Sequence, residues 1–254
     1  MLGNDVELAV GDFGDAASLR RSLAGVDRVF LASPNAPTQV QHETAVIDAA
    51  VASGVRRIVK LTTPTARVGA PVAFWDWQGQ IEEHLLRAPT PSVLVQSSFL
   101  MSNLLAAAPQ IARDATLVAP AGEARISMID PRDVAAVAAI ALTDVVVPSR
   151  VHVTGPEAIT FGRVAAALTE ITRGRVRYLD VTDAAAREGL RASGVPDWFA
   201  DPLIALFGML RRGAAEQVTD SVRAITGHPP RAIEVFLRDH TSRFTASEPA
   251  GARA

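Results

Sequence analysis

Small polar side chains collect where the expected strands end. The stretches are ASPNAP (32–37), TTPTA (62–66) and QSSF (96–99), and GDF (11–13) adds a carboxylate and a ring at a fourth strand end. In open α/β sheets, ligands bind outside the carboxyl ends of the strands. Short hydroxyl, amide and proline side chains there would let a flat polar ligand approach closely. The same residue types also turn the chain at loops, so the pattern alone leaves a purely structural role open.

Several common catalytic arrangements are missing from the sequence. No G-x-G-x-x-G stretch joins a strand to a helix, although backbone N–H groups at such a helix N-terminus bind the phosphates of a dinucleotide. A Tyr-x-x-x-Lys pair cannot form, because Tyr178 is the only tyrosine and Lys60, the only lysine, lies far upstream. The sequence contains no Gly-x-Ser-x-Gly elbow, so this motif gives no support for a hydrolase. The five histidines lack metal-ligand spacing and cysteine is absent, so we expect no metal site.

Composition limits the possible partners and the location. The 254 residues are 48% hydrophobic and 20% charged, which is ordinary for a globular protein. A net charge of −2 provides no electrostatic basis for binding nucleic acid or an anionic membrane. The most apolar stretch, VAAVAAIAL (134–142), is too short to span a bilayer, and no signal-peptide pattern follows Met1. We therefore expect a cytoplasmic protein.

Strands and helices alternate over the first hundred residues. The stretch VELAV is a short β-branched run closed by glycine, Asp15 can cap the helix that follows, and DRVFLASP is apolar enough to be buried on both faces of a parallel sheet. The expected strands are 6–10, 27–34, 55–64 and 91–99, and the expected helices are 16–25, 38–54 and 74–88. This alternation predicts an α/β fold with a doubly wound parallel sheet.

The pattern changes after about residue 100. ARISMIDPRDVAAVAAIAL (124–142) predicts a short strand and then a helix, with Asp130 and Asp133 as helix-start residues. A strand at 150–156, a helix at 160–174 and a strand at 175–182 follow, and the chain is mostly helical from there to about residue 240. The sequence thus predicts a nucleotide-binding type of domain over 1–125, a smaller helix-rich α/β region over 126–245 packed on it, whose strand 151–154 can return to the main sheet, and a disordered tail over 246–254.

In their order, these segments resemble the NmrA-like family of atypical short-chain dehydrogenase relatives. The resemblance covers nearly all of residues 6–240 and is carried by VELAVGDFGDAASLRRSLAGVDRVFLASP, SGVRRIVKLTTPTA, WDWQGQIEEHLLRAPTPSVLVQSSFLMSNLL, ISMIDPRDVAAVAAIAL and HVTGPEAITFGRVAAALTEITRGRVRYLDV. It implies a Rossmann-like sheet with a substrate-binding C-terminal region, NADPH or NADH as cofactor, and reduction of a quinone-like or enone small molecule. The family also includes non-catalytic cofactor sensors, so a regulatory NAD(P)-sensing protein is an alternative.

The resemblance implies roles for residues along the strand ends. Asp12 and Phe13 would border the adenine. The residues implied beside the ribose and nicotinamide are Ala32, Ser33, Pro34, Asn35, Thr62, Thr63 and Pro64. The residues implied around the substrate are Trp75, Trp77, Gln78, Phe99, Met101 and Asn103. The aromatic residues among them could equally be core or interface side chains.

Two departures from the family pattern affect the expected chemistry. The family often has Trp-His where this chain has Trp77-Gln78, and VLVQSSF stands where an Leu-Arg-Pro is common. An amide can donate a hydrogen bond to a carbonyl but cannot shuttle a proton near neutral pH. Gln78 and Thr63 are therefore the candidate catalytic residues. Lys60, inside an expected strand, is expected to pair with a carboxylate or to extend its ammonium towards water.

The resemblance also makes VELAV the third strand of the family's fold. The first strand, the glycine-rich turn, the first helix and the second strand would precede it. A sheet without them leaves strand edges unpaired, which favours either a mis-assigned start or a homodimer that covers the gap. If Met1 is the true start, NAD(P)H binding is in doubt, and a cofactor-independent isomerase, cyclase or dehydratase on the same scaffold becomes the alternative.

Overall fold

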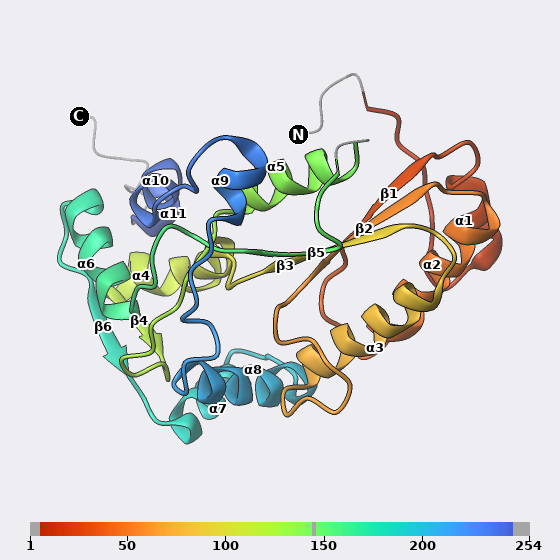
Figure 1. Cartoon of the computed structure of the whole chain (residues 1–254). Helices are drawn as coiled ribbons and strands as arrows, with labels where there is room; N and C mark the ends of the chain where they lie inside the picture. Colours follow the sequence, from red (N-terminus) through yellow and green to blue (C-terminus); the bar gives the residue numbers. More distant parts are fainter. Residues whose placement is uncertain (1–5, 144–145, 246–254) are drawn as a thin grey trace, which may run out of the picture.

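Four parallel strands form the main sheet of the computed structural model, which describes residues 6–143 and 146–245 (Figure 1). Their order is β1-β2-β3-β5, and the strands are β1 (Arg28–Leu31), β2 (Arg57–Thr62), β3 (Ser92–Ser97) and β5 (Arg150–Val153). In the register of the central strands, Lys60 of β2 is paired with Leu31 of β1 and Leu94 of β3. This parallel sheet confirms the predicted α/β fold.

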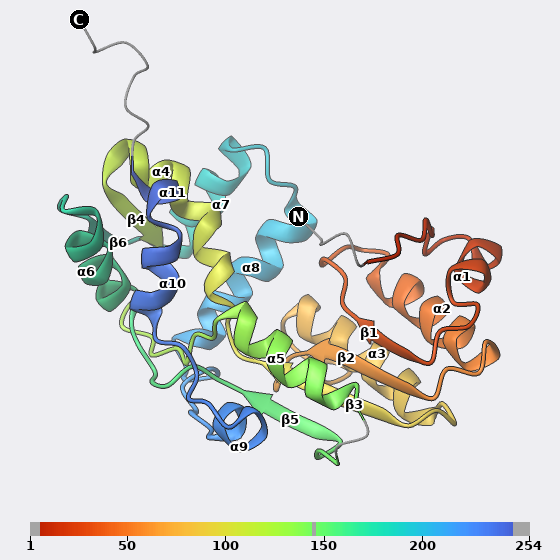
Figure 2. The same ribbon diagram turned by 90° about the horizontal axis from the view of Figure 1, so that it is seen from above.

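The two faces of the sheet are covered by different helices. On one face lie α1 (Ala16–Ser22), α2 (Gln39–Ala52) and α3 (Ala73–Arg87), and on the other lie α5 (Pro131–Ala141) and α9 (Ser221–Thr226) (Figure 2). Side chains alternate along each strand, so Ile58 packs with the α1–α3 core while its neighbour Val59 packs with the α5 core. This two-sided burial is what the apolar strands predict.

The predicted strand 6–10 is wrong. These residues have no strand conformation, and Val6, Leu8 and Val10 are 48%, 78% and 96% exposed. A short β-branched run becomes a strand only when a neighbour pairs with it, and within the described residues nothing pairs with the outer edge of β1. For the same reason β1 is not buried on both faces, and its Phe30 is 42% exposed.

The main sheet and its helices form one lobe of the protein. A second lobe is built around a separate two-stranded parallel sheet. It pairs β4 (Thr116–Ala119) with β6 (Arg177–Asp180). The helices around it are η1 (Met101–Ala107, a 3-10 helix), α4 (Ala108–Asp114), α6 (Phe161–Thr172), α10 (Ile233–Asp239) and α11 (Thr241–Phe244). The short strand expected within 124–130 is present only as isolated bridges, Leu100 with Ile129 and Ile126 with Ile159. The strand β4 was not predicted.

The chain returns from the second lobe to the main sheet through β5, which pairs with β3. At the start of α5, Asp130 accepts a hydrogen bond from the backbone N–H of Arg132, which confirms its role as a helix-start residue. Asp133, 3% exposed, accepts from the backbone N–H of Arg231 at 2.7 Å and pairs with its guanidinium. This contact between a buried carboxylate and a partly exposed arginine fastens the C-terminal segment to α5.

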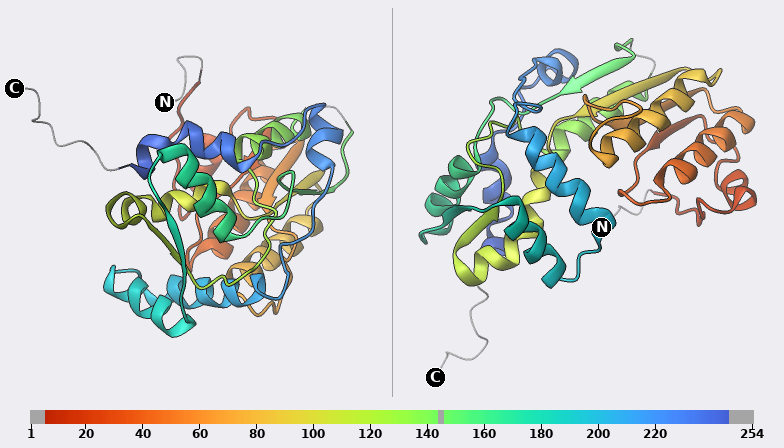
Figure 3. Two further views of the ribbon diagram at one scale, coloured as in Figure 1. Left: turned by 90° about the vertical axis from the view of Figure 1, so that its left-hand side faces the viewer. Right: turned by 90° about the horizontal axis from the view of Figure 1, so that it is seen from below.

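A helical hairpin connects the two lobes. It consists of α7 (Asp183–Ala192) and α8 (Asp197–Leu210), which are joined by the ion pairs Arg187–Asp201 and Arg191–Asp197 (Figure 3). The apolar side of α8 packs on the first turns of α3, where Phe199 lies 5.3 Å from the ring of Phe74. The hairpin therefore lies beside the carboxyl-end edge of the main sheet.

The hydrogen bonds of Tyr178 provide a test of how the second lobe is packed. Its hydroxyl donates to the backbone oxygen of Ala119 at 3.0 Å and accepts from the N–H of Ala121. Burial and the neighbouring Asp180 carboxylate raise the pKa of Tyr178 from 10.0 to about 12. Because the folded state holds this proton more tightly, its stabilising effect is complete below pH 10 and is lost as pH rises towards 12.

We therefore expect the phenolate absorbance of the folded protein to titrate near pH 12 and that of the denatured protein near 10.0. Tyr178 is the only tyrosine, so the ultraviolet signal needs no assignment. Asp180→Asn, which removes the negative charge, should lower the midpoint in the folded protein. A folded-state midpoint equal to that of the denatured chain would contradict the hydrogen bonding described here.

Candidate functional site

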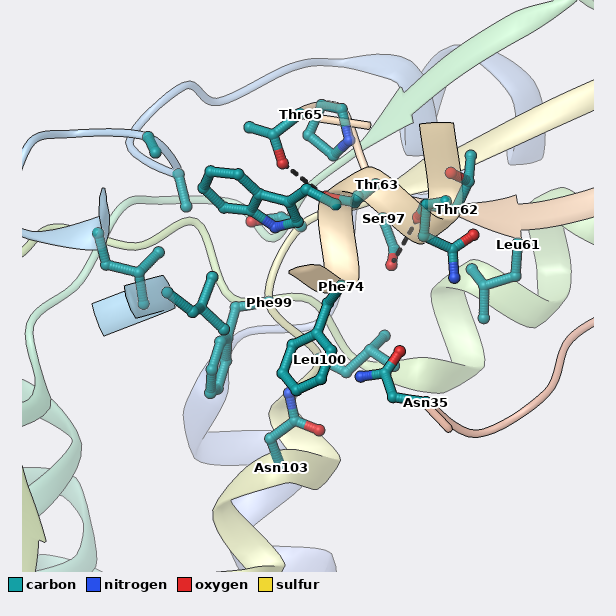
Figure 4. A pocket seen from close by; sticks show the side chains of 18 of the residues that line it. Asn35, Leu61, Thr62, Thr63, Thr65, Phe74, Ser97, Phe99, Leu100 and Asn103 are labelled. Atoms are coloured by element: carbon teal, nitrogen blue, oxygen red, sulfur yellow. Dashed lines mark hydrogen bonds between the residues drawn. The ribbon is translucent and has the colours of Figure 1, made fainter. Parts of the chain in front are cut away.

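A cavity of about 360 Å³ opens at the carboxyl ends of β1, β2 and β3 (Figure 4). In this view the hydroxyl side chains of Thr62, Thr63 and Ser97 lie in the upper part, and the rings of Phe74 and Phe99 lie below them. The lining residues are Ser33, Pro34, Asn35, Leu61, Thr62, Thr63, Pro64, Thr65, Phe74, Trp75, Gln78, Ser97, Ser98, Phe99, Leu100, Asn103, Leu206, Leu210, Ala214 and Ala215. Part of the wall is thus polar and part apolar, and every described lining residue is uncharged.

The strand ends supply the polar part of the wall. Thr62, the last residue of β2, donates from its hydroxyl to the Glu82 carboxylate at 2.6 Å. Glu82 is 3% exposed and also pairs with Arg150 of β5, with 2.5 Å between the guanidinium and carboxylate atoms. Beyond it, the hydroxyls of Thr63 and Thr65 lie 3.1 Å apart. The buried Glu82 therefore holds the Thr62 hydroxyl in one direction.

Behind the cavity wall lies an ion pair in which both side chains are buried. The Lys60 ammonium is 1% exposed and lies 2.9 Å from the carboxylate of Glu43, which is fully buried in α2. Lys60 also donates to the side-chain oxygen of Gln78 at 2.9 Å and to the backbone oxygen of Leu61. Burial lowers the pKa of Lys60, and the Glu43 charge opposes that shift. Of the two expectations for Lys60, the structure shows the pairing with a carboxylate.

Gln78 reaches the cavity because α3 passes close to the loop after β2. At the next position, Gly79, a Cβ would lie 2.2 Å from the backbone carbon of Arg67, so only glycine allows this approach. The loop 63–70 that carries Thr63, Pro64 and Thr65 is thereby held against the helix that carries Gln78. Sequence reasoning named Gln78 but missed this glycine contact.

The structure brings most of the predicted site residues together. Those on the cavity wall are Ser33, Pro34, Asn35, Thr62, Thr63, Pro64, Trp75, Gln78, Phe99 and Asn103. Others lie off the wall, since Met101 is 1% exposed in the core of the second lobe and Trp77 packs on Phe74. Asp12, Phe13 and Ala32 also lie outside the cavity. Their roles at the adenine and ribose, and those of all the residues implied by the resemblance, stay predictions.

Four lining residues from the α8 region were not predicted. They are Leu206, Leu210, Ala214 and Ala215. Their signal in the sequence is the apolar stripe of WFADPLIALFGML, but that stripe does not tell which surface it covers. They come to the cavity because α8 packs on α3, a contact between segments more than a hundred residues apart.

The residues present suit the nicotinamide half of a dinucleotide. Neutral hydroxyl, amide and proline side chains at the ends of three parallel strands match the polar ring of a nicotinamide, which is uncharged in its reduced form. The usual binding element for the phosphates of a dinucleotide is not seen, because within the described residues no glycine-rich turn joins a strand to a helix at this edge. Ser33, Asn35, Thr62 and Thr63 are the residues that could hold the nicotinamide end.

Other kinds of site are not seen in the described part of the chain. Within it, no three histidine, aspartate, glutamate or cysteine side chains gather where they could hold a metal ion. None of its helices is long and apolar enough to cross a membrane.

A parallel sheet flanked by helices on both faces, with an uncharged cavity at the strand ends, defines a Rossmann-like fold. The model of the NmrA-like family matches residues 3–225, and the chain belongs to this family. Among similar proteins, the NAD(P)H azoreductase of Xenophilus azovorans is 35% identical over 243 residues, which are 95% of this chain and 85% of that protein.

Two further similar proteins extend this comparison. A reductase of Streptomyces griseus that acts on a (4-alkanoyl-5-oxo-2,5-dihydrofuran-3-yl)methyl phosphate is 35% identical over 95% of this chain and 86% of its own length. The crystal structure of an NADPH-dependent quinone oxidoreductase from Escherichia coli in complex with NADPH superposes with a TM-score of 0.82, covering 92% of this chain and 83% of that one. At 24% identity, this second likeness shows the fold.

Proposed function

We propose that this protein is an NAD(P)H-dependent oxidoreductase that reduces a small quinone-like or enone molecule. The observation that carries the proposal is the uncharged cavity at the ends of β1, β2 and β3, where hydroxyl side chains and Gln78 face apolar and aromatic residues. Membership of the NmrA-like family and the likeness to an NAD(P)H azoreductase support the same reaction class.

In the proposed reaction the chain provides position and hydrogen bonds. Ser33, Asn35, Thr62 and Thr63 would hold the nicotinamide end of the cofactor, which would supply a hydride. Gln78 donates a hydrogen bond to the acceptor's carbonyl oxygen, which gains negative charge as it is reduced. Since an amide has no proton to give up near neutral pH, the proton that completes the reduction comes from water. Phe74, Trp75 and Phe99 pack on the flat acceptor.

The cavity also favours an uncharged substrate. Each described residue of its wall is neutral, so nothing on the wall offers an ion pair to a phosphate or carboxylate group. Burying an unpaired anion there would be costly. The relative named for a phosphate ester therefore differs from this chain in the substrate we expect, although the two are 35% identical.

Replacing Gln78 with alanine should lower kcat for a test quinone by about 10-fold, which corresponds to the loss of one hydrogen bond in the transition state. The affinity for NADPH, measured by nicotinamide fluorescence, should stay within about 2-fold, because the amide acts on the acceptor. Gln80→Ala is the matched control, since Gln80 lies on the same helix and its side chain, among the described residues, bonds only to Asp76. An unchanged kcat in Gln78→Ala would remove this residue from the mechanism.

Titration of the purified chain with NADPH and NADH, followed by turnover of a quinone, an enone and an azo compound, tests the proposed activity. Binding with turnover supports the oxidoreductase. Binding without turnover of any acceptor would favour the NAD(P)-sensing regulator, and the absence of binding would favour the cofactor-independent alternatives. The cytoplasmic location and the homodimer also stay predictions, and size-exclusion chromatography with light scattering tests the second.

A further inference from the structure

The Lys60–Glu43 ion pair lies directly behind the cavity and contacts two residues of its wall. Lys60 donates to the side-chain oxygen of Gln78 at 2.9 Å, and Glu43 accepts from the hydroxyl of Ser33 at 2.6 Å. Both charged side chains are at most 1% exposed. The pair thus joins a residue at the end of β1 to a residue on α3 from the side that a ligand cannot reach.

The Lys60 ammonium can contact the Gln78 amide only at its oxygen. A lysine ammonium has three N–H donors and no acceptor. Here the Leu61 backbone oxygen and the Gln78 side chain accept hydrogen bonds from it, and a Glu43 carboxylate oxygen lies 2.9 Å away as its ion-pair partner. The atom of Gln78 that faces Lys60 must therefore be the amide oxygen, and the NH₂ group is the end left free for the cavity.

The carboxylate fixes the Ser33 hydroxyl in the same way. An ionised carboxylate only accepts hydrogen bonds, so the proton of the Ser33 hydroxyl points at Glu43 and away from the cavity. The amide nitrogen of Gln39 approaches the same two groups, at 3.1 Å from Glu43 and 3.4 Å from Ser33. Ser33 therefore presents oxygen lone pairs, not a proton, to whatever occupies the cavity.

We propose that Lys60 and Glu43 are positioning residues that set the direction of two hydrogen bonds in the site, with Gln78 as a donor and Ser33 as an acceptor. The proposal rests on the proposed function for the role of Gln78 on the acceptor. A ligand that places a carbonyl oxygen or an azo nitrogen at Gln78 and an N–H or O–H group at Ser33 matches this pattern. A group that can only donate a hydrogen bond at Gln78 does not.

A spectroscopic test uses the chain as it is. Because Lys60 is the only lysine, ¹⁵N-lysine labelling yields a single side-chain signal. At neutral pH we expect an ammonium signal that exchanges slowly with water, and in Gln78→Ala a clear change in its chemical shift, because one of its hydrogen-bond acceptors is lost. Asn103→Ala, which alters the cavity wall without touching Lys60, should leave the signal in place. A neutral amine, or the same shift in Gln78→Ala as in the unaltered chain, would overturn the proposal.

A double-mutant cycle tests the positioning role. The background is Lys60→Met/Glu43→Gln, in which a neutral pair keeps an acceptor for Ser33. In the unaltered chain Gln78→Ala should cost about 10-fold in kcat, and in this background less than about 2-fold, because Gln78 is no longer held. Lys60→Arg is a second background that keeps the charge, and the planar guanidinium cannot place its N–H groups as the compact ammonium does. A full 10-fold cost in either background would overturn the proposal.

The two proposals fail in different ways. If Gln78→Ala does not change kcat in the unaltered chain, the proposed function loses its hydrogen-bond donor, while the lysine signal still reports whether Lys60 holds the amide. Asp133→Asn is the control for a merely structural effect, because Asp133 is also buried in an ion pair but lies away from the cavity. It should lower stability and leave the 10-fold effect of Gln78→Ala intact.

Discussion

Replacing Lys60 with methionine is expected to lower the free energy of unfolding by about 3–5 kcal/mol, because it leaves a charge buried without its partner. The Glu43 carboxylate is 0% exposed, and its nearest cation is the Lys60 ammonium at 2.9 Å. The oxygens of Gln78 and Leu61 also lose their donor. Urea unfolding followed by circular dichroism measures this loss.

The double variant Lys60→Met/Glu43→Gln shows whether the loss comes from the unpaired charge. The glutamine keeps an oxygen for Ser33 and Gln39 but carries no charge, so most of the stability should return. If Lys60→Met alone costs less than about 1 kcal/mol, the ion pair is not the buried contact described here. If the double variant is no more stable than the single one, the loss has a different cause, such as poor packing of methionine in β2.

Replacing Gly79 with alanine is expected to cost about 3 kcal/mol, near the upper end of what overpacking usually costs. A Cβ at this position would lie 2.2 Å from the backbone carbon of Arg67 and 2.5 Å from the backbone nitrogen of Val68. Since these are backbone atoms, a side-chain rotation cannot relieve the contact, and the loop after β2 must lift from α3. Thermal unfolding measures the loss, and turnover should fall as well because that loop carries Thr63 and Thr65.

Gly189→Ala is the matched control for this prediction. Gly189 also lies inside a helix, α7, but a Cβ there would meet no atom within 4 Å. Alanine is the better helix former by about 1 kcal/mol, so this variant should gain stability while Gly79→Ala loses it. A gain in both variants would mean that α3 and the loop are farther apart than in this structure.

Local sequence pattern predicted the main sheet well, because the strands that form it are apolar and alternate with helices of clear period. The expected strands 27–34, 55–64 and 91–99 contain β1, β2 and β3. The expected helix 38–54 contains α2, and the expected helix 74–88 is shifted by one residue from α3. The stretch 6–10 has the same β-branched composition and forms no strand. The composition of a segment indicates how readily it can pair as a β-strand. Whether it does so depends on a neighbouring strand that the rest of the chain must supply.

In the candidate site, too, some residues could be predicted from the local sequence and others depend on tertiary packing. Strand ends could be named from the sequence, because parallel strands bring their carboxyl ends to one edge, and Ser33, Thr62, Thr63 and Gln78 do lie on one cavity wall. The contribution of α8 could not be named, since it depends on tertiary packing against α3. The partner of Lys60 was also out of reach, because a carboxylate seventeen residues upstream, on a helix, is one of many that a folded chain can bring to it.

The burial of Lys60 has a practical consequence for following the sheet as it opens. A protease that cleaves after lysine has a single target in this chain, the bond between Lys60 and Leu61. That bond lies inside β2, paired with β1 on one side and β3 on the other. Cleavage therefore requires molecules whose central strand has separated from both neighbours, and the rate at which two fragments accumulate counts those molecules. Cleavage after Lys60 therefore measures how often the central strand of the sheet opens.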